Sequence, residues 1–261
     1  MADPSAYPPG TFGWVDLMTT DPAAATAFYG AVFGWEVGNE PFAGGAQTPI
    51  RADGALAGGL TEIPAENRAA GSRPQWFNNV VVEDVDEAVR RAGEHGGTVH
   101  GALLDLPGFG RVAIVEDPTG ASFAAWQPDA AMPTPRFNDP GFLVWNELNT
   151  HDPAAATAFY GGLLGWAPRT RAEGGSLPTT TFVLGDRMVG GLIEIQPEWG
   201  EVPPHWLPYF AVAAIDDAVA TIRERGGTVH AGPQPSPYGR IAICEDPQGA
   251  AFGVFEATAA A

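Results

Sequence analysis

The chain has 261 residues, is 45% hydrophobic and carries a formal net charge of −18. All 13 basic residues are Arg, which excludes lysine-based Schiff-base chemistry and a Walker-type phosphate loop. Because the charge is strongly acidic, nucleic acid and anionic membranes are poor partners, and the single cysteine, Cys244, excludes an internal disulfide.

The first predicted elements are a strand, a helix and a set of shorter strands. Residues 12–18 read as a strand. Asp21 followed by Pro22 is typical of a helix start, and Gly34 marks the end of that helix. A loop rich in Gly, Ala and Pro follows, with shorter strand candidates up to Ile63.

A second strand–helix pattern comes next. Residues 77–82 predict a strand, and Asp84 begins a helix that ends at Gly96-Gly97. Further strands are expected at 98–100, 111–115 and 122–126. The region therefore consists of two similar units, which we describe as paired βαββ modules.

The chain then repeats itself. The segment Asp21–Gly30 recurs letter for letter at Asp152–Gly161, and Gly96–His100 recurs at Gly226–His230. Repeats in the same order and at nearly constant spacing indicate one duplicated domain. The repeat stops in a Pro-rich segment that is typical of a stiff linker. We predict a first domain at residues 10–128, a linker at 129–138 and a second domain at 139–257.

These segments resemble the vicinal oxygen chelate superfamily, which includes glyoxalase I, bleomycin-resistance proteins and extradiol dioxygenases. The resemblance rests on the strand leading into Asp-Pro, on the Phe-Tyr-Gly helix, and on the later Gly-Gly-Thr-Val and Asp-Pro-Thr-Gly segments. The chain is most similar to tandem actinobacterial proteins of the glyoxalase-like type. The resemblance implies an α+β fold of two tandem glyoxalase-like domains, each with a curled mixed or antiparallel sheet that forms a cup for a small molecule.

Enzymes of this superfamily bind a divalent metal through His, Glu or Gln on facing strands. The matching positions here are Trp14, Phe77 and Ala124 in the first half, and Trp145, Leu207 and Gly253 in the second. Their side chains offer a hard cation no ligand, and shifting the register by one residue does not supply three ligands. We therefore expect no metal and no other cofactor. A non-standard metal site that uses Asp16 or Glu147 remains an alternative.

Strand alternation predicts which side chains line each cup. They are mostly aromatic with a few polar groups, as is usual for a small-molecule pocket. The predicted ligand-binding residues are Trp14, Met18, Phe77, Asn79, Arg111 and Trp126 in the first half, and Trp145, Asn149, Tyr209, Arg240 and Phe255 in the second. The alternative is that the aromatic residues are simply core.

Asp16 and Glu147 are the candidate catalytic residues. A carboxylate among indole rings is desolvated, so its pKa should rise and it could act as a general acid or base. The alternative for each is an ion pair with Arg or a surface position. Arg111 and Arg240 could clamp a ligand anion, or could instead pair with the nearby acids Glu116 and Glu245.

Three functional hypotheses follow. The first is metal-independent binding of a small aromatic or planar metabolite or drug. The second is a natural-product tailoring or isomerising enzyme that uses Asp16 or Glu147 in acid–base chemistry. The third is a glyoxalase- or dioxygenase-type metalloenzyme with unusual ligands. We expect a cytoplasmic monomer or homodimer, because the sequence shows neither a secretory signal nor an apolar run long enough to cross a bilayer.

Overall fold

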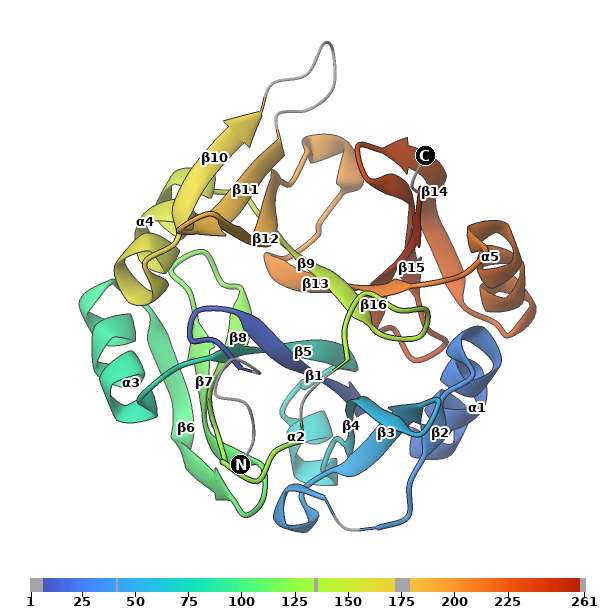
Figure 1. Cartoon of the computed structure of the whole chain (residues 1–261), viewed down its shortest axis with the longest axis horizontal. Helices are drawn as coiled ribbons and strands as arrows, with labels where there is room; N and C mark the ends of the chain where they lie inside the picture. Colours follow the sequence, from blue (N-terminus) through green and yellow to red (C-terminus); the bar gives the residue numbers. More distant parts are fainter. Residues whose placement is uncertain (1–6, 41, 134–135, 172–178, 259–261) are drawn as a thin grey trace. The chain divides into compact units, whose positions relative to one another are not determined.

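The computed structural model describes residues 7–40, 42–133, 136–171 and 179–258. In the first half (Figure 1) the elements are β1 (Phe12–Thr19), α1 (Pro22–Phe33), β2 (Glu36–Val37), a 3₁₀ turn (Ala43–Gly45), β3 (Thr48–Ala52), β4 (Ala55–Glu62), α2 (Ala65–Ala69), β5 (Gln75–Val81), α3 (Val85–Glu94), β6 (Thr98–Leu106), β7 (Gly110–Glu116) and β8 (Ser122–Pro128).

The second half repeats this order. Its elements are β9 (Leu143–Thr150), α4 (Pro153–Leu164), β10 (Ala167–Arg171), β11 (Thr179–Leu184), β12 (Arg187–Glu194), a 3₁₀ turn (Pro197–Trp199), β13 (His205–Ala211), α5 (Ile215–Glu224), β14 (Thr228–Ser236), β15 (Gly239–Glu245) and β16 (Ala251–Ala257). None of the described helices is long and apolar enough to cross a membrane.

Each half forms one eight-stranded mixed sheet. The strand order is β2-β3-β4-β1-β5-β8-β7-β6 in the first sheet and β10-β11-β12-β9-β13-β16-β15-β14 in the second. In each module the strand before the helix pairs in parallel with the last strand, and the other pairs within the module are antiparallel. A module therefore has three strands after its helix, one more than the predicted βαββ unit.

The helix ends form as the sequence predicts. The Asp21 side chain accepts a hydrogen bond from Ala24 N at 3.0 Å, and Gly34 ends the helix in the left-handed conformation with φ 70°. The side chain of Asp84 likewise accepts from the Asp86 and Glu87 amides at the start of α3. These contacts satisfy amide groups that a helix start leaves without an internal partner.

The chain packs into two compact units, and each unit takes one module from each half. One unit comprises the described parts of residues 1–13, 78–134 and 145–207, and the other comprises 14–77, 135–144 and 208–261. The second module of the first half therefore packs with the first module of the second half, and the reverse holds for the other unit. The repeat by itself does not decide whether modules pair within or across halves, and the packing shows that they pair across them.

A buried polar contact joins the two halves within the first unit. Tyr160 Oη on α4 donates to Asp117 Oδ2 at 2.9 Å and accepts from Trp206 Nε1 at 2.7 Å. Asp117 Oδ1 also accepts from Ala121 N at 3.1 Å, which holds the turn between β7 and β8. The repeated Phe-Tyr-Gly and Asp-Pro-x-Gly motifs thus meet across the halves.

The second unit contains the same contact made from the repeated residues. Tyr29 Oη on α1 donates to Asp246 Oδ2 at 3.0 Å and accepts from Trp76 Nε1 at 3.0 Å. Burial raises the pKa of Tyr29 well above its ordinary value, and it raises the pKa of Asp246 as well. Both copies of the contact therefore hold their polar groups in a desolvated core.

The second glycine of the repeated Gly-Gly-Thr-Val segment packs closely against an aromatic ring from the other half. A Cβ atom at Gly97 would lie 2.6 Å from Phe159 Cε2, and one at Gly227 would lie 2.9 Å from Phe28 Cε2. Both rings belong to the repeated helix segment, on α4 and α1. The second glycine of this segment is thus required for close packing between modules of different halves.

Replacing Gly97 with Ala should lower the free energy of unfolding by about 1–3 kcal/mol, because an added methyl group overpacks the contact with Phe159. Urea denaturation measures the change. The matched control is Gly93→Ala in the exposed part of α3, where a Cβ meets nothing within 4 Å, and it should leave stability unchanged or raise it by up to ~1 kcal/mol. Equal effects of the two substitutions would contradict this packing argument.

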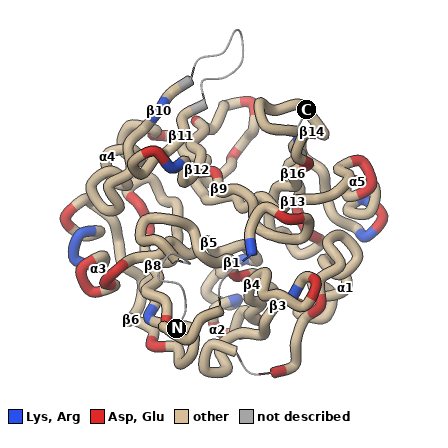
Figure 2. Tube along the Cα trace, in the orientation of Figure 1, with Lys and Arg blue, Asp and Glu red and all other residues tan. Residues whose placement is uncertain are grey.

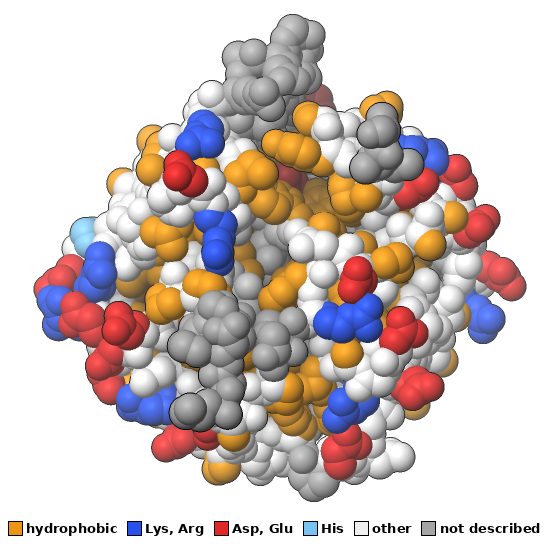
Figure 3. Space-filling view, in the orientation of Figure 1, with side chains coloured by type: hydrophobic (Ala, Val, Ile, Leu, Met, Phe, Trp, Pro, Cys, Tyr) orange, Lys and Arg blue, Asp and Glu red, His pale blue; other side chains and the backbone are white. Residues whose placement is uncertain are grey.

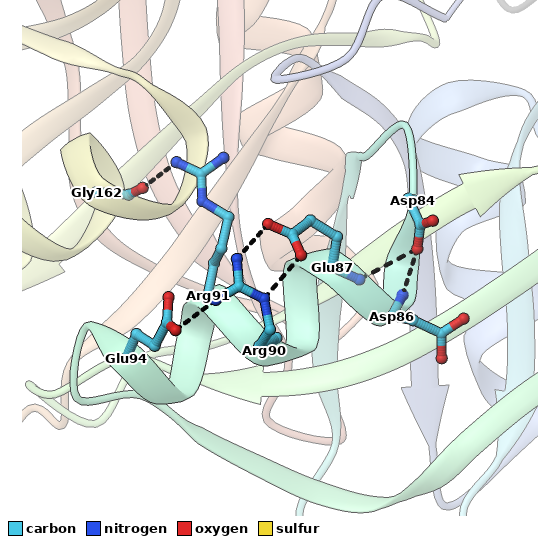
Figure 4. A network of polar contacts seen from close by, with 7 residues as sticks. All are labelled: Asp84, Asp86, Glu87, Arg90, Arg91, Glu94 and Gly162. Carbon is cyan, nitrogen blue, oxygen red and sulfur yellow. Dashed lines mark hydrogen bonds and ion pairs between the residues drawn. The ribbon is translucent and has the colours of Figure 1, made fainter.

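Charged side chains gather on the helices α3 and α5 (Figures 2 and 3). On α3, Arg90 pairs with Glu87 and Glu94, while Arg91 donates to the backbone carbonyl of Gly162 on α4 (Figure 4). Exposed pairs of this kind contribute little to stability, because solvent screens the charges. The Arg91 bond differs because it ties α3 to α4 within the first unit.

Candidate functional site

An indole and a carboxylate lie side by side on β1. Trp14 and Asp16 point to the same face because they are two residues apart on a strand, and Trp14 Nε1 donates to Asp16 Oδ1 at 2.8 Å. Only 4% of Trp14 and 8% of Asp16 is exposed. This burial agrees with the interpretation of Asp16 as a desolvated carboxylate and not with a surface position, which was one of the alternatives.

The neighbouring strand and loop enclose this pair. Gly59 on β4 lies opposite Asp16, and a Cβ atom there would lie 2.4 Å from Asp16 Oδ1 and 2.5 Å from Gln47 Oε1. Gln47 Oε1 is buried and has no hydrogen-bond partner within the described residues. The Phe42 ring lies 5.5 Å from the Trp14 ring, centroid to centroid. The absence of a side chain at residue 59 is therefore what allows these groups to converge.

Sequence reasoning missed Gln47 and Gly59, although a signal for the glycine was present. Gly-Gly-Leu occurs at residues 58–60 and again at 190–192, in the strands that lie beside β1 and β9. Gln47 precedes a short strand and has no counterpart of the same type in the repeat. It could not have been identified without the sheet register.

The second half presents a related pair on β9, with different exposure. Trp145 and Glu147 are partly exposed, whereas Asn149 is buried, with 6% of its surface exposed. Gly191 on β12 lies opposite Glu147. A Cβ atom at Gly191 would lie 3.0 Å from Trp145 Nε1 and 3.3 Å from Glu147 Oε2, so the indole and the carboxylate both border this glycine.

The predicted residues of the second modules lie on β5 and β13. Phe77 and Asn79 are buried on β5, and Asn79 lies opposite Ala124 on β8. Tyr209 is buried on β13 opposite Gly253, and a Cβ atom at Gly253 would lie only 2.2 Å from Tyr209 Cδ1. The ring of Tyr209 therefore covers the position where the family's carboxylate ligand would begin.

The residues at the family's metal positions do not fit a divalent cation. The positions carry indole, phenyl and methyl groups in the first half, and indole, isobutyl and no side chain in the second. Among the described residues, no group of three or more His, Cys, Asp or Glu side chains could hold a metal ion. Hard cations require several oxygen or nitrogen donors, and the family ligand set is not available at these positions.

The strands β4 and β12, which lie beside β1 and β9, do not supply a metal ligand either. Gly59 and Thr61 lie opposite Asp16 and Met18, so Glu62 falls beside Thr19 on the other face of the sheet. Glu62 is exposed and lies 3.7 Å from Arg68. Glu194 takes the equivalent position beside Thr150. Both acids therefore belong to the outer face of their strands.

Trp126 lies in a tightly packed aromatic cluster in the first unit. It is fully buried, its Nε1 donates to the carbonyl of Phe109 at 3.0 Å, and its ring stacks on Phe109 at 4.8 Å. Tyr7 packs edge-on against it at 5.0 Å. These contacts account for Trp126 by core packing, which was the alternative interpretation. A contact with ligand at Trp126 or at the partly exposed Phe255 stays a prediction.

Arg111 and Arg240 each form an ion pair with an acid, but not with the acids expected from the sequence. Arg111 Nη1 lies 2.8 Å from Asp86 Oδ2, and Arg240 Nη1 lies 2.8 Å from Asp216 Oδ2. Hydrogen bonding to Arg111 lowers the pKa of Asp86. The expected partners, Glu116 and Glu245, instead lie within 3.4 Å of His100 and His230.

This difference has a simple cause. The expected acids are near each arginine in sequence, whereas helices α3 and α5 place a first-turn Asp beside β7 and β15.

Cys244 is fully buried, and burial raises the pKa of its thiol to about 12, so the thiol stays protonated near neutral pH. His205 is partly exposed, and desolvation by the groups around it lowers its pKa.

Comparison with known proteins supports one family for both halves. The model of the Glyoxalase/Bleomycin resistance protein/Dioxygenase superfamily matches residues 11–124 and again 142–254. A Mycobacterium tuberculosis protein named "Putative glyoxylase CFP32" is 36% identical over 97% of each chain. The Streptomyces peucetius protein named "Anthracycline biosynthesis protein DnrV" is 35% identical, over 96% of this chain and 94% of its own length.

A solved structure shows the same fold at low sequence identity. The Mn(II)-bound glyoxalase from Novosphingobium aromaticivorans superposes with a TM-score of 0.65 at 16% identity, over 95% of this chain and 82% of that chain. The tandem sheets, the repeated motifs and both family matches agree with one another. This chain is therefore a member of the glyoxalase/bleomycin resistance/dioxygenase superfamily.

Proposed function

We propose that this protein binds a small aromatic, planar metabolite without a metal ion, at an indole–carboxylate pair of the kind that β1 and β9 each carry. The observation that carries the proposal is the Trp14–Asp16 pair and its counterpart Trp145–Glu147, which occupy the strand where the family would place its first metal ligand. An indole can stack on a planar ligand, and a carboxylate can accept a hydrogen bond from a ligand hydroxyl or amine.

Two relatives point to the chemical class of the ligand. The Streptomyces proteins named for anthracycline biosynthesis match this chain over 96% of its length. An anthracycline carries a flat, fused aromatic system with phenolic hydroxyl groups, which suits an indole beside a carboxylate. We therefore propose a polycyclic aromatic of this kind as the ligand, bound by a cytoplasmic protein that is a monomer or a homodimer.

Fluorescence titration tests this proposal. Titrating the protein with an anthracycline in excess EDTA should give saturable quenching of tryptophan emission, because the ligand stacks on an indole without help from a metal. The same titration with a non-planar sugar of similar size is the control. Quenching that appears only after Mn²⁺ is restored, or no saturable quenching by any planar aromatic, would contradict the proposal.

A second candidate function is acid–base tailoring of the same class of ligand. The enclosed carboxylate of Asp16 and the matching Glu147 favour it, because desolvation beside an indole is a condition that makes a carboxylate a useful base. Comparing Glu147→Gln with Asp16→Asn separates this activity from binding alone. Turnover of a bound anthracycline precursor that one substitution abolishes, while affinity stays unchanged, would establish catalysis.

A further inference from the structure

We infer that the ligand site lies in the second half of the chain, at Trp145 and Glu147, and that the first half fills the equivalent space with its own side chains. This inference rests on the proposed function and asks which of two related positions performs it. The duplication makes the comparison internal, because Asp16 and Glu147 lie opposite equivalent glycines, Gly59 and Gly191.

The position in the first half is closed. Trp14 and Asp16 are 4% and 8% exposed, so neither offers a ligand more than a small surface. The space above Gly59 is taken by two oxygen atoms, Asp16 Oδ1 at 2.4 Å and Gln47 Oε1 at 2.5 Å from where a Cβ would be. Trp14 already donates its indole N–H to Asp16. A ligand could reach this carboxylate only after these side chains moved.

The position in the second half is more open. Trp145 and Glu147 both keep partly exposed side chains. Above Gly191 the nearest atoms are 3.0 and 3.3 Å from where a Cβ would be, and they belong to the indole and the carboxylate themselves. Among the residues that the structure describes, no third side chain comes as close to this glycine as Gln47 comes to Gly59.

The chemistry of the open position indicates what it would recognise. Trp145 offers a ring face, Trp145 Nε1 can donate, and the Glu147 carboxylate can accept, all beside a residue with no side chain. A planar aromatic ring could approach the backbone of β12 closely at Gly191 and present a hydroxyl donor to Glu147. The longer side chain of Glu147, compared with Asp16, extends the carboxylate further from its strand.

Oxidative footprinting of the unmodified protein, read out by peptide mass spectrometry, tests this assignment. Without ligand, Trp145 should be oxidised faster than Trp14, because it is more exposed. Adding an anthracycline in excess EDTA should slow the oxidation of Trp145 severalfold and leave that of Trp14 unchanged. This measurement needs no variant and therefore does not depend on whether a substituted protein folds.

Paired substitutions give a second, independent measurement. Trp145→Phe should weaken anthracycline binding, measured by calorimetry, by about tenfold, which corresponds to the ~1.4 kcal/mol that a good aromatic contact supplies. Trp14→Phe should change the affinity by less than about twofold, with folding of both variants checked by circular dichroism. Protection of Trp14, or loss of binding in Trp14→Phe alone, would overturn the assignment while leaving the proposed function intact. If the unmodified protein binds no planar aromatic at all, the proposed function itself fails.

Discussion

Replacing Tyr160 with Phe is expected to lower the free energy of unfolding by about 1–3 kcal/mol at neutral pH. The substitution keeps the ring but removes the hydroxyl that donates to Asp117 at 2.9 Å and accepts from Trp206 at 2.7 Å. It therefore leaves a buried carboxylate oxygen and an indole N–H without their partner. Tyr29→Phe should have a similar effect through Asp246 and Trp76. Urea denaturation measures both.

Tyr160→Phe should also change how the free energy of unfolding depends on pH. Burial raises the pKa of Tyr160 well above 10, so between pH 10 and that higher value the native tyrosine stays protonated while the unfolded one ionises. The native state then binds more protons, and stability falls as pH rises above 10, by about 1.4 kcal/mol per pH unit for each such tyrosine. Tyr160→Phe removes one of these contributions, so its penalty at neutral pH should shrink at alkaline pH.

Two results would contradict this account. One is a penalty for Tyr160→Phe that is the same at neutral pH and at pH 11. The other is an equal penalty for the control Tyr238→Phe, since Tyr238 is 57% exposed in the β14–β15 hairpin and its substitution should stay within ~0.5 kcal/mol.

Replacing Trp126 with Ala is expected to cost about 3–5 kcal/mol of stability, the largest effect of any single substitution considered. Trp126 is fully buried, stacks on Phe109 and donates to its carbonyl. Truncation therefore leaves a cavity and removes one hydrogen bond to that carbonyl, which keeps the bond from Asp129 N at 3.0 Å. Thermal or urea denaturation measures the loss. The control is Trp199→Ala, because Trp199 is 44% exposed and should change stability by less than ~1 kcal/mol.

A milder substitution at the same position decides whether Trp126 serves core packing or contacts the ligand. Trp126→Phe should fold with a smaller loss of stability and bind an anthracycline as tightly as the unmodified protein. A large loss of affinity in a stable Trp126→Phe protein would show that the ring contacts the ligand, contrary to the packing seen around Phe109 and Tyr7.

Much of the fold could be predicted because local signals and the repeat agree. Asp21 and Gly34 define a helix by capping alone, and the exact recurrence of Asp21–Gly30 transfers that helix to the second half. The pairing of modules across halves could not be predicted. Tyr29 and Asp117 lie in the same half, as do Tyr160 and Asp246, so contacts within and across halves use identical residue types. Only the three-dimensional packing distinguishes them.

The candidate site was predictable where one strand determines it. Trp14 and Asp16 had to share a face because strand side chains alternate, and they are hydrogen-bonded as neighbours. Contacts between elements were not predictable from sequence distance. Arg111 pairs with Asp86 on a helix rather than with Glu116 on its own strand. Asp16 and Gln47 both border Gly59, which only the register of the strands reveals.

Native mass spectrometry of the freshly purified, chelator-free protein tests the central claim most directly. We expect the mass of the polypeptide alone, or of the polypeptide with a co-purified organic molecule that remains after EDTA treatment. A divalent metal bound at one ion per half, surviving buffer exchange and removed by EDTA together with aromatic binding, would contradict it. That result would mean that side chains other than those at the family's ligand positions form a metal centre.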